Sequence, residues 1–318
     1  MKKILVTYNM FREGYAELMS KYDVTFPPEG RESFTYEEVL ELIPTYDGLQ
    51  SMYNFPVDRQ LLERGTKLKI VSNYAVGYDN IDIACATERG IVVTNTPDPV
   101  TEPTADMAMG LMLAVARRIS DCDRRLRIPG ALNWGLLDNL GYSLQGKQLG
   151  IVGMGRIGQA LARRALASGM RVVYSNRRPV APEIEQKYQA RRMELEELLQ
   201  TSDVVSLNAP HTHQTYHLIN EESIRLMKPT SVLINTARGP LVDERALADA
   251  LREKRIFGAG LDVFEFGHQV SEELLSLDNV VLTPHTGTQT FDVRNEMARF
   301  VSDNIIRFFD GKSVARVN

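Results

Sequence analysis

The sequence is poor in cysteine and tryptophan: its 318 residues include two cysteines, Cys85 and Cys122, and one tryptophan. Two cysteines cannot staple a chain of this size, so the fold must be stabilised by burial of apolar side chains. Such cysteine usage is typical of a reducing compartment, and we expect a cytoplasmic protein in which neither thiol reacts.

Charge of one sign and long apolar runs are also lacking. Lys and Arg number 37 against 41 Asp and Glu, a net charge of −4, which provides no general basic field for nucleic acid or an anionic membrane. The longest apolar run, around 108–116, is far below the roughly 18 residues that cross a bilayer. Residues 1–6 resemble the start of a signal peptide, but polar residues from Thr7 onward indicate a first strand instead.

Short β-branched runs alternate with helix-length segments, which is the pattern of βα units on parallel sheets. In the first hundred residues we expect strands at 4–6, 48–49, 68–71 and 91–93, with helices at 15–21 and 36–43. After Gly146 we expect six strands, at 148–152, 171–174, 203–207, 231–235, 260–263 and 280–282. Helices between them are expected at 156–168, 194–200, 221–227 and 243–253. The prediction is an α/β protein with two Rossmann-like domains and doubly wound parallel sheets.

A long apolar helix is expected between the two series. Residues 101–104 supply hydroxyl caps, an acid and an early proline, and the Met- and Ala-rich segment 105–119 follows. Such a helix is typical of a core or a subunit interface. The arginines that follow it alternate with aspartates, which favours a solvated face or a subunit contact. The tail, 292–309, has apolar residues at helical spacing, and we expect it to pack on the first domain.

A glycine motif, Gly153-x-Gly155-x-x-Gly158, follows the strand at 148–152 and opens a helix. Its glycines permit a tight turn, close approach of the backbone to a pyrophosphate, and close packing of helix on strand, while the helix N-terminus attracts the anion. The placement between strand and helix predicts dinucleotide binding. The alternative is a glycine turn without a ligand.

The next strand ends in Ser175, Asn176, Arg177 and Arg178. A carboxylate at this position would accept hydrogen bonds from the adenosine ribose of NAD, but none is present. Two guanidinium groups, a hydroxyl and an amide can instead hold a 2′-phosphate. We predict a preference for NADP(H), with NAD(H) as the alternative cofactor. Solvated loop arginines are the competing interpretation.

Two further polar segments follow strands, 235–240 with Arg238 and 283–287 with His285. Ligands of open α/β sheets bind at such strand ends. A guanidinium can fork onto the carboxylate of a 2-oxo acid, and an imidazolium can donate a proton to the oxygen as a hydride reaches the carbon. A surface arginine and a core histidine are the alternatives.

In these segments and several others, the chain resembles the D-isomer-specific 2-hydroxyacid dehydrogenases over nearly its whole length. The 175–179 variant is similar to the glyoxylate and hydroxypyruvate reductase branch, which uses NADPH. The segments that carry the resemblance are 75–82, 101–106, the glycine motif, 235–244, 260–264 and 283–287.

The resemblance implies roles for individual residues. Arg238 would bind the substrate carboxylate and carbonyl, and His285 would be the acid/base. Backbone amides of Val76 and Gly77 would complete the carboxylate pocket, with Tyr53 at its lip. The residues implied to face the cofactor are Arg156 and Ile157 at the pyrophosphate, Asp262 at the nicotinamide carboxamide, and Pro210, Thr236 and Ala237.

The resemblance also implies an organisation of domains. A discontinuous substrate-binding domain, 1–100 and 286–318, would close over an NADP-binding domain, 101–285, with the active site in the cleft between them. The substrate would be a small 2-oxo or 2-hydroxy acid of the glyoxylate, hydroxypyruvate or pyruvate type. We expect a homodimer through the 101–134 region, with no metal, nucleic acid or membrane partner.

One position departs from the family. Members normally carry Glu-Pro five residues after the aspartate of Leu-Asp-Val-Phe, where this chain has Gly267 and His268. Glu265, two positions earlier, does not inherit the role. The missing carboxylate would have oriented His285 and favoured its protonated form, so we expect a slower reductase with a more acidic optimum.

The sequence leaves three alternatives open. His211, His213 and His217 have a spacing that could suit a metal, although a polar loop is the favoured interpretation because no further ligands accompany them. A catalytically weak NADP(H)-binding sensor would retain the glycine motif, but retention of Arg238 and His285 argues against it. Oxidation of phosphonate or formate on a similar scaffold would need other pocket residues.

Overall fold

The structure is a computed structural model that describes residues 1–267 and 269–318; His268, part of the departure noted above, lies outside these ranges. The chain forms two compact units. Unit 1 comprises Met1–Val100 and Thr288–Asn318, and unit 2 comprises Thr101–Gly287. The second boundary falls two residues beyond the expected one, because the amides of Thr286 and Gly287 donate to Asp262 inside unit 2.

Unit 1 contains a five-stranded parallel sheet in the order β2-β1-β3-β4-β5. Apolar side chains on its two faces feed two separate cores. The strands are β1 (Lys3–Val6), β2 (Asp23–Thr25), β3 (Gly48–Met52), β4 (Ile70–Tyr74) and β5 (Val92–Thr94). Because neighbouring residues of β1 point to opposite faces, Leu5 enters one core while Ile4 and Val6 enter the other.

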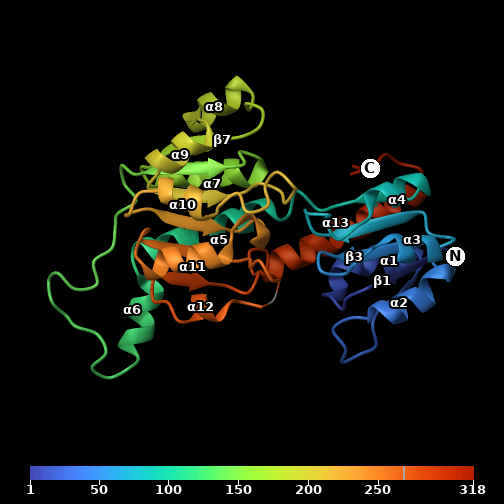
Figure 1. Ribbon diagram of the computed structural model, residues 1–318. Coiled ribbons are helices and arrows are strands. Elements are labelled where there is room, and N and C mark those ends of the chain that lie inside the picture. The colour runs from blue at the N-terminus through green and yellow to red at the C-terminus, as the bar shows by residue number, and fades with distance from the viewer. Residues whose placement is uncertain (268) are drawn as a thin grey trace. The chain divides into compact units, whose positions relative to one another are not determined.

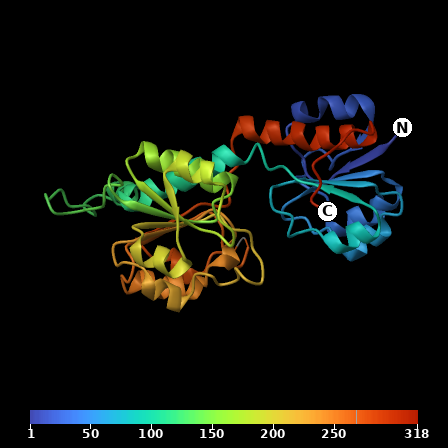
Figure 2. The ribbon, with the colours of Figure 1, turned by 90° about the horizontal axis from the view of Figure 1, so that it is seen from above.

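Helices cover both faces of this sheet (Figure 2). One face carries α2 (Tyr36–Leu42), α3 (Arg59–Arg64) and α4 (Ile83–Glu88), with the short turn η2 (Ile43–Thr45). The other carries η1 (Arg12–Tyr15), α1 (Ala16–Lys21) and α13 (Phe291–Phe309). The N-terminal and C-terminal ends of the chain therefore build one core, as expected for the tail.

Helix α13 is bound to the sheet by hydrogen bonds as well as by packing. The Tyr74 hydroxyl donates to the carbonyl of Arg294, and the Ser72 hydroxyl donates to the carbonyl of Val301 at 3.1 Å. Burial raises the pKa of Tyr74 to about 12. The hydroxyl therefore keeps its proton, and this bond, across the neutral pH range.

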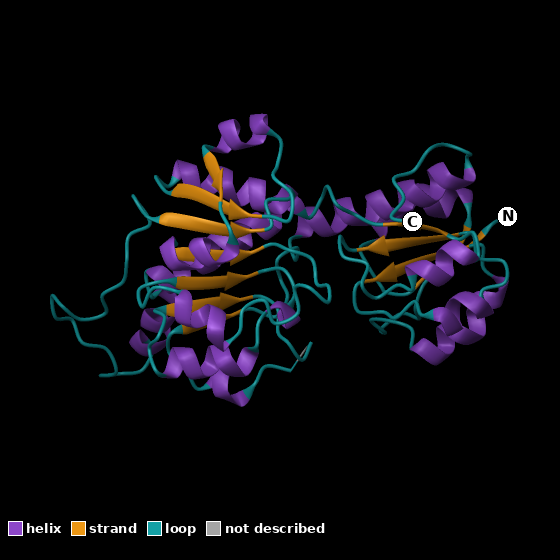
Figure 3. Ribbon diagram, turned by 45° about the horizontal axis from the view of Figure 1, so that its top comes forward, coloured by secondary structure: helices purple, strands orange, loops and turns teal. Residues whose placement is uncertain are grey.

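Unit 2 contains a seven-stranded parallel sheet in the order β12-β11-β10-β9-β6-β7-β8. Its strands all run in the same direction, so their carboxyl ends lie on the same side of the sheet (Figure 3). They are β6 (Gln148–Val152), β7 (Arg171–Ser175), β8 (Ala190–Arg192), β9 (Val204–Leu207), β10 (Val232–Asn235), β11 (Gly258–Leu261) and β12 (Val280–Leu282). The chain order reverses between β6 and β9, which is where such sheets bind ligands.

Two layers of helices cover the sheet of unit 2 (Figure 1). One layer consists of α5 (Thr101–Ala116), α7 (Arg156–Ala167) and α8 (Pro182–Tyr188). The other consists of α9 (Leu195–Thr201), α10 (Glu221–Leu226), α11 (Glu244–Arg252) and α12 (Glu272–Leu275), with the short turn η3 (Gly239–Leu241). Helix α6 (Ile119–Leu126) follows α5 after a break at Arg118, whose φ of 54° is left-handed.

The α/β class and the doubly wound parallel sheets are as predicted. The prediction was wrong in the number of strands, since β2 and β8 were missed; each has only three residues and lies at an edge of its sheet. The helix expected at 105–119 begins earlier and ends at Ala116. In the described part of the chain, no helix combines the length and apolar character needed to cross a membrane.

Candidate functional site

The glycine turn after β6 has the geometry that its motif predicts. Gly153 has a φ of +100°, and a Cβ there would lie 2.7 Å from the backbone of Asn208, so only glycine fits. A Cβ on Gly158 would lie 2.4 Å from the Gly153 carbonyl, which explains the close approach of α7 to the strand end. Around Gly155 a Cβ would meet nothing within 4 Å. The turn therefore leaves open space beside the N-terminus of α7.

The end of β7 holds this turn in place. The Gly153 amide donates to the carbonyl of Ser175 at 3.0 Å, and the Met154 amide donates to Asn176 Oδ1 at 2.7 Å. Asn176 therefore positions the glycine turn in addition to lying beside it. The Arg177 and Arg178 side chains that follow are exposed.

An additional arginine lies beside these two, which the sequence analysis missed. Arg192 pairs with Tyr174 across β7 and β8, and its Nε and Nη2 atoms donate to the Asn176 carbonyl at 3.3 and 3.1 Å. Its distance along the sequence concealed it, because β8 was not predicted. The end of β7 therefore presents three guanidinium groups.

A cleft of about 850 Å³ opens along this edge of unit 2. It runs from the glycine turn to the loop after β9, which contains Pro210. The described residues that line it include Gly153, Gly155, Ser175, Asn176, Arg177, Arg178, Asn208, Pro210, Thr212 and Thr215. Open space, amides at a helix N-terminus and basic side chains at the far end fit the pyrophosphate and ribose portions of a dinucleotide.

Three neighbouring strand ends bring the predicted reacting residues together. Arg238 follows β10, Asp262 follows β11, and His285 follows β12, and these strands are adjacent and parallel. Backbone bonds continue the register beyond the strands: the Asp262 amide donates to the Asn235 carbonyl, and the His285 amide donates to the Asp262 carbonyl, both at 2.9 Å. Arg238 and His285, 47 positions apart in the sequence, thus both lie at the carboxyl ends of the strands of one sheet.

The Asp262 carboxylate organises the loop that carries His285. Asp262 is 1% exposed, and its Oδ1 accepts from the Thr283 hydroxyl at 2.6 Å and the Thr286 amide at 2.8 Å. Its Oδ2 accepts from the Gly287 amide at 2.8 Å. These bonds enclose His285, whose φ of 54° is uncommon for a residue with a side chain. The carboxylate that the resemblance assigned to the nicotinamide therefore points into the histidine loop.

The turn that carries Arg238 is fixed by its own neighbours. The Asn235 side chain, 1% exposed, accepts from the Ala237 amide and donates to the Arg238 carbonyl, each at 3.0 Å. A Cβ on Gly239 would lie 1.8 Å from the Phe264 carbonyl, so the turn packs directly on the loop after β11. Arg238 is half-buried and donates from Nη1 to the Ala237 carbonyl at 2.7 Å. The backbone turn that carries the guanidinium is therefore fixed by hydrogen bonds and close packing.

The Glu265 carboxylate binds His217 and the Glu244 amide, and not any described residue of the loop that carries His285. Its Oε1 lies 2.6 Å from His217 Nε2, and its Oε2 accepts from the Glu244 amide at 3.0 Å. This pairing also accounts for one of the three histidines considered for a metal. Among the described residues, which omit His268, no group of three or more His, Cys, Asp or Glu side chains is placed to hold a metal ion.

Gly267 adopts a conformation that suits glycine. Its φ is +70°, and a Cβ there would meet nothing within 4 Å. A glutamate would therefore have room at this position, but its backbone would be left-handed, at a cost of about 1–2 kcal/mol.

The predicted residues of the carboxylate pocket belong to unit 1. Tyr53 follows β3, and Val76 and Gly77 follow β4, and these strands are adjacent and parallel. All three residues are half-buried. Unit 1 thus brings them together at the carboxyl edge of its sheet.

Comparison with known proteins identifies the family. The sequence profile described as "D-isomer specific 2-hydroxyacid dehydrogenase, NAD binding domain" matches residues 109–287. A glyoxylate reductase of Thermococcus onnurineus is 47% identical over 314 residues, covering 98% of this chain and 93% of that protein. The chain belongs to this family.

Solved structures of two reductases match nearly the whole chain. A glyoxylate reductase from Paecilomyes thermophila has a TM-score of 0.90 and 34% identity, covering 99% of this chain and 98% of that one. An NADPH-dependent glyoxylate/hydroxypyruvate reductase from Sinorhizobium meliloti, solved with NADP and malonate, has a TM-score of 0.86 and 33% identity, covering 99% and 96%.

Proposed function

We propose that this D-2-hydroxyacid dehydrogenase reduces a small 2-oxo acid of the glyoxylate, hydroxypyruvate or pyruvate type to the D-2-hydroxy acid. The observation that carries the proposal is the position of Arg238 and His285 at the carboxyl ends of β10 and β12, the two strands that flank β11 in one sheet. The similarity to glyoxylate reductases supports it. The same similarity disfavours a sensor without catalytic activity.

Each residue in this proposal has a chemical task. A reduced nicotinamide cofactor supplies the hydride when bound. The Arg238 guanidinium forks onto the substrate carboxylate and polarises the carbonyl, and the His285 imidazolium donates a proton to the carbonyl oxygen. In the reverse direction a neutral imidazole accepts that proton. Asp262 acts as a positioning residue, because its hydrogen bonds fix the His285 loop.

Asp262 bears on the absent family glutamate. A catalytic group displaced by 1 Å can lose on the order of a hundredfold in rate. Here the backbone of His285 is fixed by Asp262, so much of the orientation survives without a carboxylate at position 267. We therefore infer a working reductase whose turnover is slower, and whose pH optimum is more acidic, than in family members that carry the glutamate.

Tyr53, Val76 and Gly77 would contact the substrate from unit 1. In this proposal unit 1 is the substrate-binding domain and unit 2 the cofactor-binding domain. The backbone amides of Val76 and Gly77 would bind the carboxylate, and Tyr53 would limit the space for the substrate side chain.

NADP(H) is the proposed cofactor in preference to NAD(H). No carboxylate follows β7 to repel a 2′-phosphate, while Ser175, Arg177 and Arg178 line the cleft and Arg192 lies at the Asn176 carbonyl. Charge-assisted hydrogen bonds to a phosphate are worth about 1.5–3 kcal/mol each. The glycine turn, Arg156, Ile157 and Pro210 would face the pyrophosphate, and Thr236 and Ala237 the nicotinamide end.

A panel of 2-oxo acids assayed with both cofactors tests activity and cofactor preference together. We expect NADPH oxidation with glyoxylate, hydroxypyruvate or pyruvate, and a KM for NADPH about tenfold or more below that for NADH. Replacing both Arg177 and Arg178 by alanine should remove this preference. Arg191→Ala is a matched control, because Arg191 is exposed on the same short strand as Arg192 and pairs with Glu197. Equal use of NADH by the wild type would overturn the preference, and turnover of none of the acids would overturn the activity.

A homodimer through the segment after α5 is also proposed. Seven apolar side chains between Ile119 and Leu140 are more than half exposed, Leu136 being 99% exposed. They are Ile119, Leu126, Ile128, Trp134, Leu136, Leu137 and Leu140. Many exposed large apolar side chains within one short segment are typical of a surface covered by another chain.

Light scattering should give a solution mass of twice the 35.8 kDa chain. We expect Leu136→Arg with Leu137→Arg to yield monomers, because two charges would be buried without partners at the interface. Leu275→Arg serves as the control, since Leu275 is 60% exposed elsewhere in unit 2. A wild-type monomer at micromolar concentration contradicts the proposal.

A further inference from the structure

Fully buried polar side chains line the middle of the sheet in unit 1. Gln50, Ser51, Ser72 and Asn73 are each 0% exposed, in strands whose other residues are mainly apolar. Parallel strands covered on both faces are normally apolar throughout, and burial of an amide is costly unless its hydrogen bonds are made. The partners of these groups should therefore indicate what they hold.

Asparagine side chains bind two carbonyl groups of the loop after β4. Asn95 Nδ2 donates to the Val76 carbonyl and Asn73 Nδ2 donates to the Gly77 carbonyl, each at 2.8 Å. The Ala75 carbonyl accepts from the Thr96 amide at 2.9 Å. Three successive carbonyl groups of this loop are thus bound by the body of unit 1.

These bonds determine where the amides of the same loop point. In a planar trans peptide the N–H lies opposite the C=O. Binding of the Ala75 and Val76 carbonyl groups therefore turns the N–H groups of Val76 and Gly77 away from the donors that hold the loop. Within the described ranges no acceptor lies on either N–H. Two oriented donors remain available for an anion.

A third asparagine joins this loop to the one after β3. Asn80 Nδ2 donates to the Met52 and Phe55 carbonyls at 3.0 and 2.9 Å, on either side of Tyr53. The two loops also pair through their backbones: the Val57 amide donates to the Asn80 carbonyl, and the Asp82 amide donates to the Val57 carbonyl. Asn73 Nδ2 also lies 3.4 Å from Asn80 Oδ1, so these two asparagines are linked directly, while Asn95 joins them through the loop after β4.

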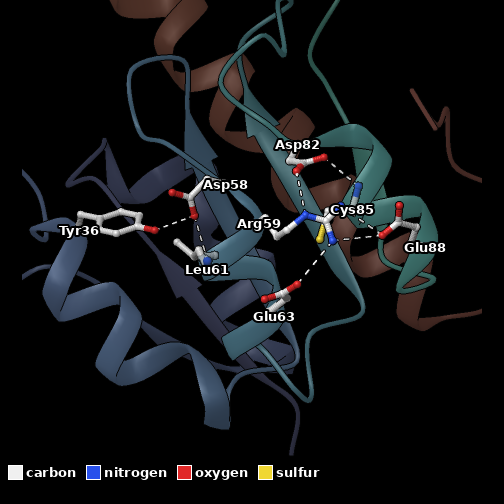
Figure 4. Close-up of polar contacts among 8 residues, drawn as sticks. All are labelled: Tyr36, Asp58, Arg59, Leu61, Glu63, Asp82, Cys85 and Glu88. Carbon is white, nitrogen blue, oxygen red and sulfur yellow. Dashed lines mark hydrogen bonds and ion pairs between the residues drawn. The ribbon is translucent and has the colours of Figure 1, made fainter.

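The helices that follow these loops are tied to each other as well (Figure 4). Asp58 caps α3 and Asp82 caps α4 through hydrogen bonds from the Leu61 and Cys85 amides. Arg59 reaches from α3 to Glu88 of α4 at 3.2 Å and to Asp82 at 3.8 Å. Both loops are therefore anchored at each end.

We propose that Asn95, Asn73 and Asn80 are positioning residues that set the direction of the Val76 and Gly77 amides for a substrate carboxylate. The inference rests on the proposed function. Amides already oriented toward the anion bind it without the cost of reorganising the loop. We call the Val76 and Gly77 amides, with the asparagines that orient them, the cradle. Without Asn95, the peptide between Val76 and Gly77 is free to rotate, and the Gly77 amide no longer points toward the anion.

Asn95→Leu tests the proposal, because it removes the donor at similar size without adding charge. We expect the KM for glyoxylate and the inhibition constant of oxamate, a carboxylate probe, to rise together about tenfold. The value of kcat should change by less than about twofold, since such a contact acts equally on substrate and transition state. Binding of NADPH, followed by fluorescence titration, should not change. A merely structural defect would not separate KM from kcat in this way.

Asn279→Leu is the matched control. Asn279 is also half-buried and also donates one side-chain bond to a carbonyl, that of Leu251 at 3.0 Å, but it lies in unit 2. The control should lose a similar amount of thermal stability and keep the wild-type KM. Asn73→Ser, which removes the Nδ2 donor to the Gly77 carbonyl without adding charge, provides a second variant if Asn95→Leu does not fold. The same rise in KM is expected from it.

Two further results separate this inference from the proposed function. If the wild type turns over glyoxylate and both asparagine variants keep its KM and its oxamate inhibition constant, the cradle inference is wrong and the reductase proposal stands. If the wild type has no turnover, oxamate binding by calorimetry decides: weaker binding to Asn95→Leu supports the cradle, and equal or absent binding overturns it.

Discussion

Replacement of Arg238 by glutamine should lower kcat/KM for glyoxylate by about a thousandfold, one of the two largest effects that we expect from single substitutions. A buried charge pair that loses one partner costs about 3–5 kcal/mol, and 1.4 kcal/mol is a factor of ten. Glutamine keeps most of the side-chain length but neither the charge nor the fork. Steady-state kinetics measure the loss, and NADPH titration should show that the cofactor still binds.

Two related variants sharpen this experiment. Arg238→Lys keeps the positive charge without the two parallel donors, and its activity should fall between those of wild type and glutamine variant. Arg225→Gln is a control, because Arg225 is an exposed helix arginine whose partner is Glu221, four residues earlier. Should Arg238→Gln retain activity within about tenfold of the wild type, the carboxylate role of Arg238 would be refuted.

His285→Asn should lower kcat for reduction by about 10²–10⁴-fold, the usual contribution of a general acid. Asparagine is chosen because it tolerates the left-handed backbone that His285 adopts, with φ of 54°. The substitution thus removes the proton donor with little strain. Rates measured over a pH series should also lose the decline that deprotonation of the imidazolium produces at higher pH.

A separate variant distinguishes loss of chemistry from disturbance of the loop. Asp262→Asn leaves His285 in place but replaces an acceptor of several hydrogen bonds by an amide. Asp262→Asn should therefore unfold at a lower temperature than the wild type, whereas His285→Asn should unfold close to the wild-type temperature. An unchanged pH profile in His285→Asn would exclude this histidine as the acid.

The sequence predicted the parts of the fold that depend on apolar periodicity. Long strands and helices such as β6 and α7 were expected nearly at their observed bounds. The strands β2 and β8 were missed, because three residues at a sheet edge carry too little pattern. Arg192 was missed for the same reason, since only the pairing of β7 with β8 brings it to Asn176.

The sequence predicted most of the residues that form the candidate site, but not the hydrogen bonds that hold those residues in place. Strand ends and glycine spacing led to Arg238 and His285, because parallel topology brings such ends together. Two of the hydrogen bonds to the Asp262 carboxylate come from backbone amides, which every residue except proline has, and these leave no mark in the sequence. The direction of the Val76 and Gly77 amides was equally hidden, since it depends on asparagines up to 19 positions away.

Interleaving of the two units has a consequence for biosynthesis. Unit 2 is continuous, so all of its strands have been synthesised once Gly287 has left the ribosome. Unit 1 lacks six of the fourteen buried residues described for one core until α13 emerges, since Val301 and Ile305 belong to the same core as Ile4 and Val6 of β1. Contacts this distant in sequence are slow to form. The nascent chain must therefore keep its first hundred residues from aggregating until translation is nearly complete.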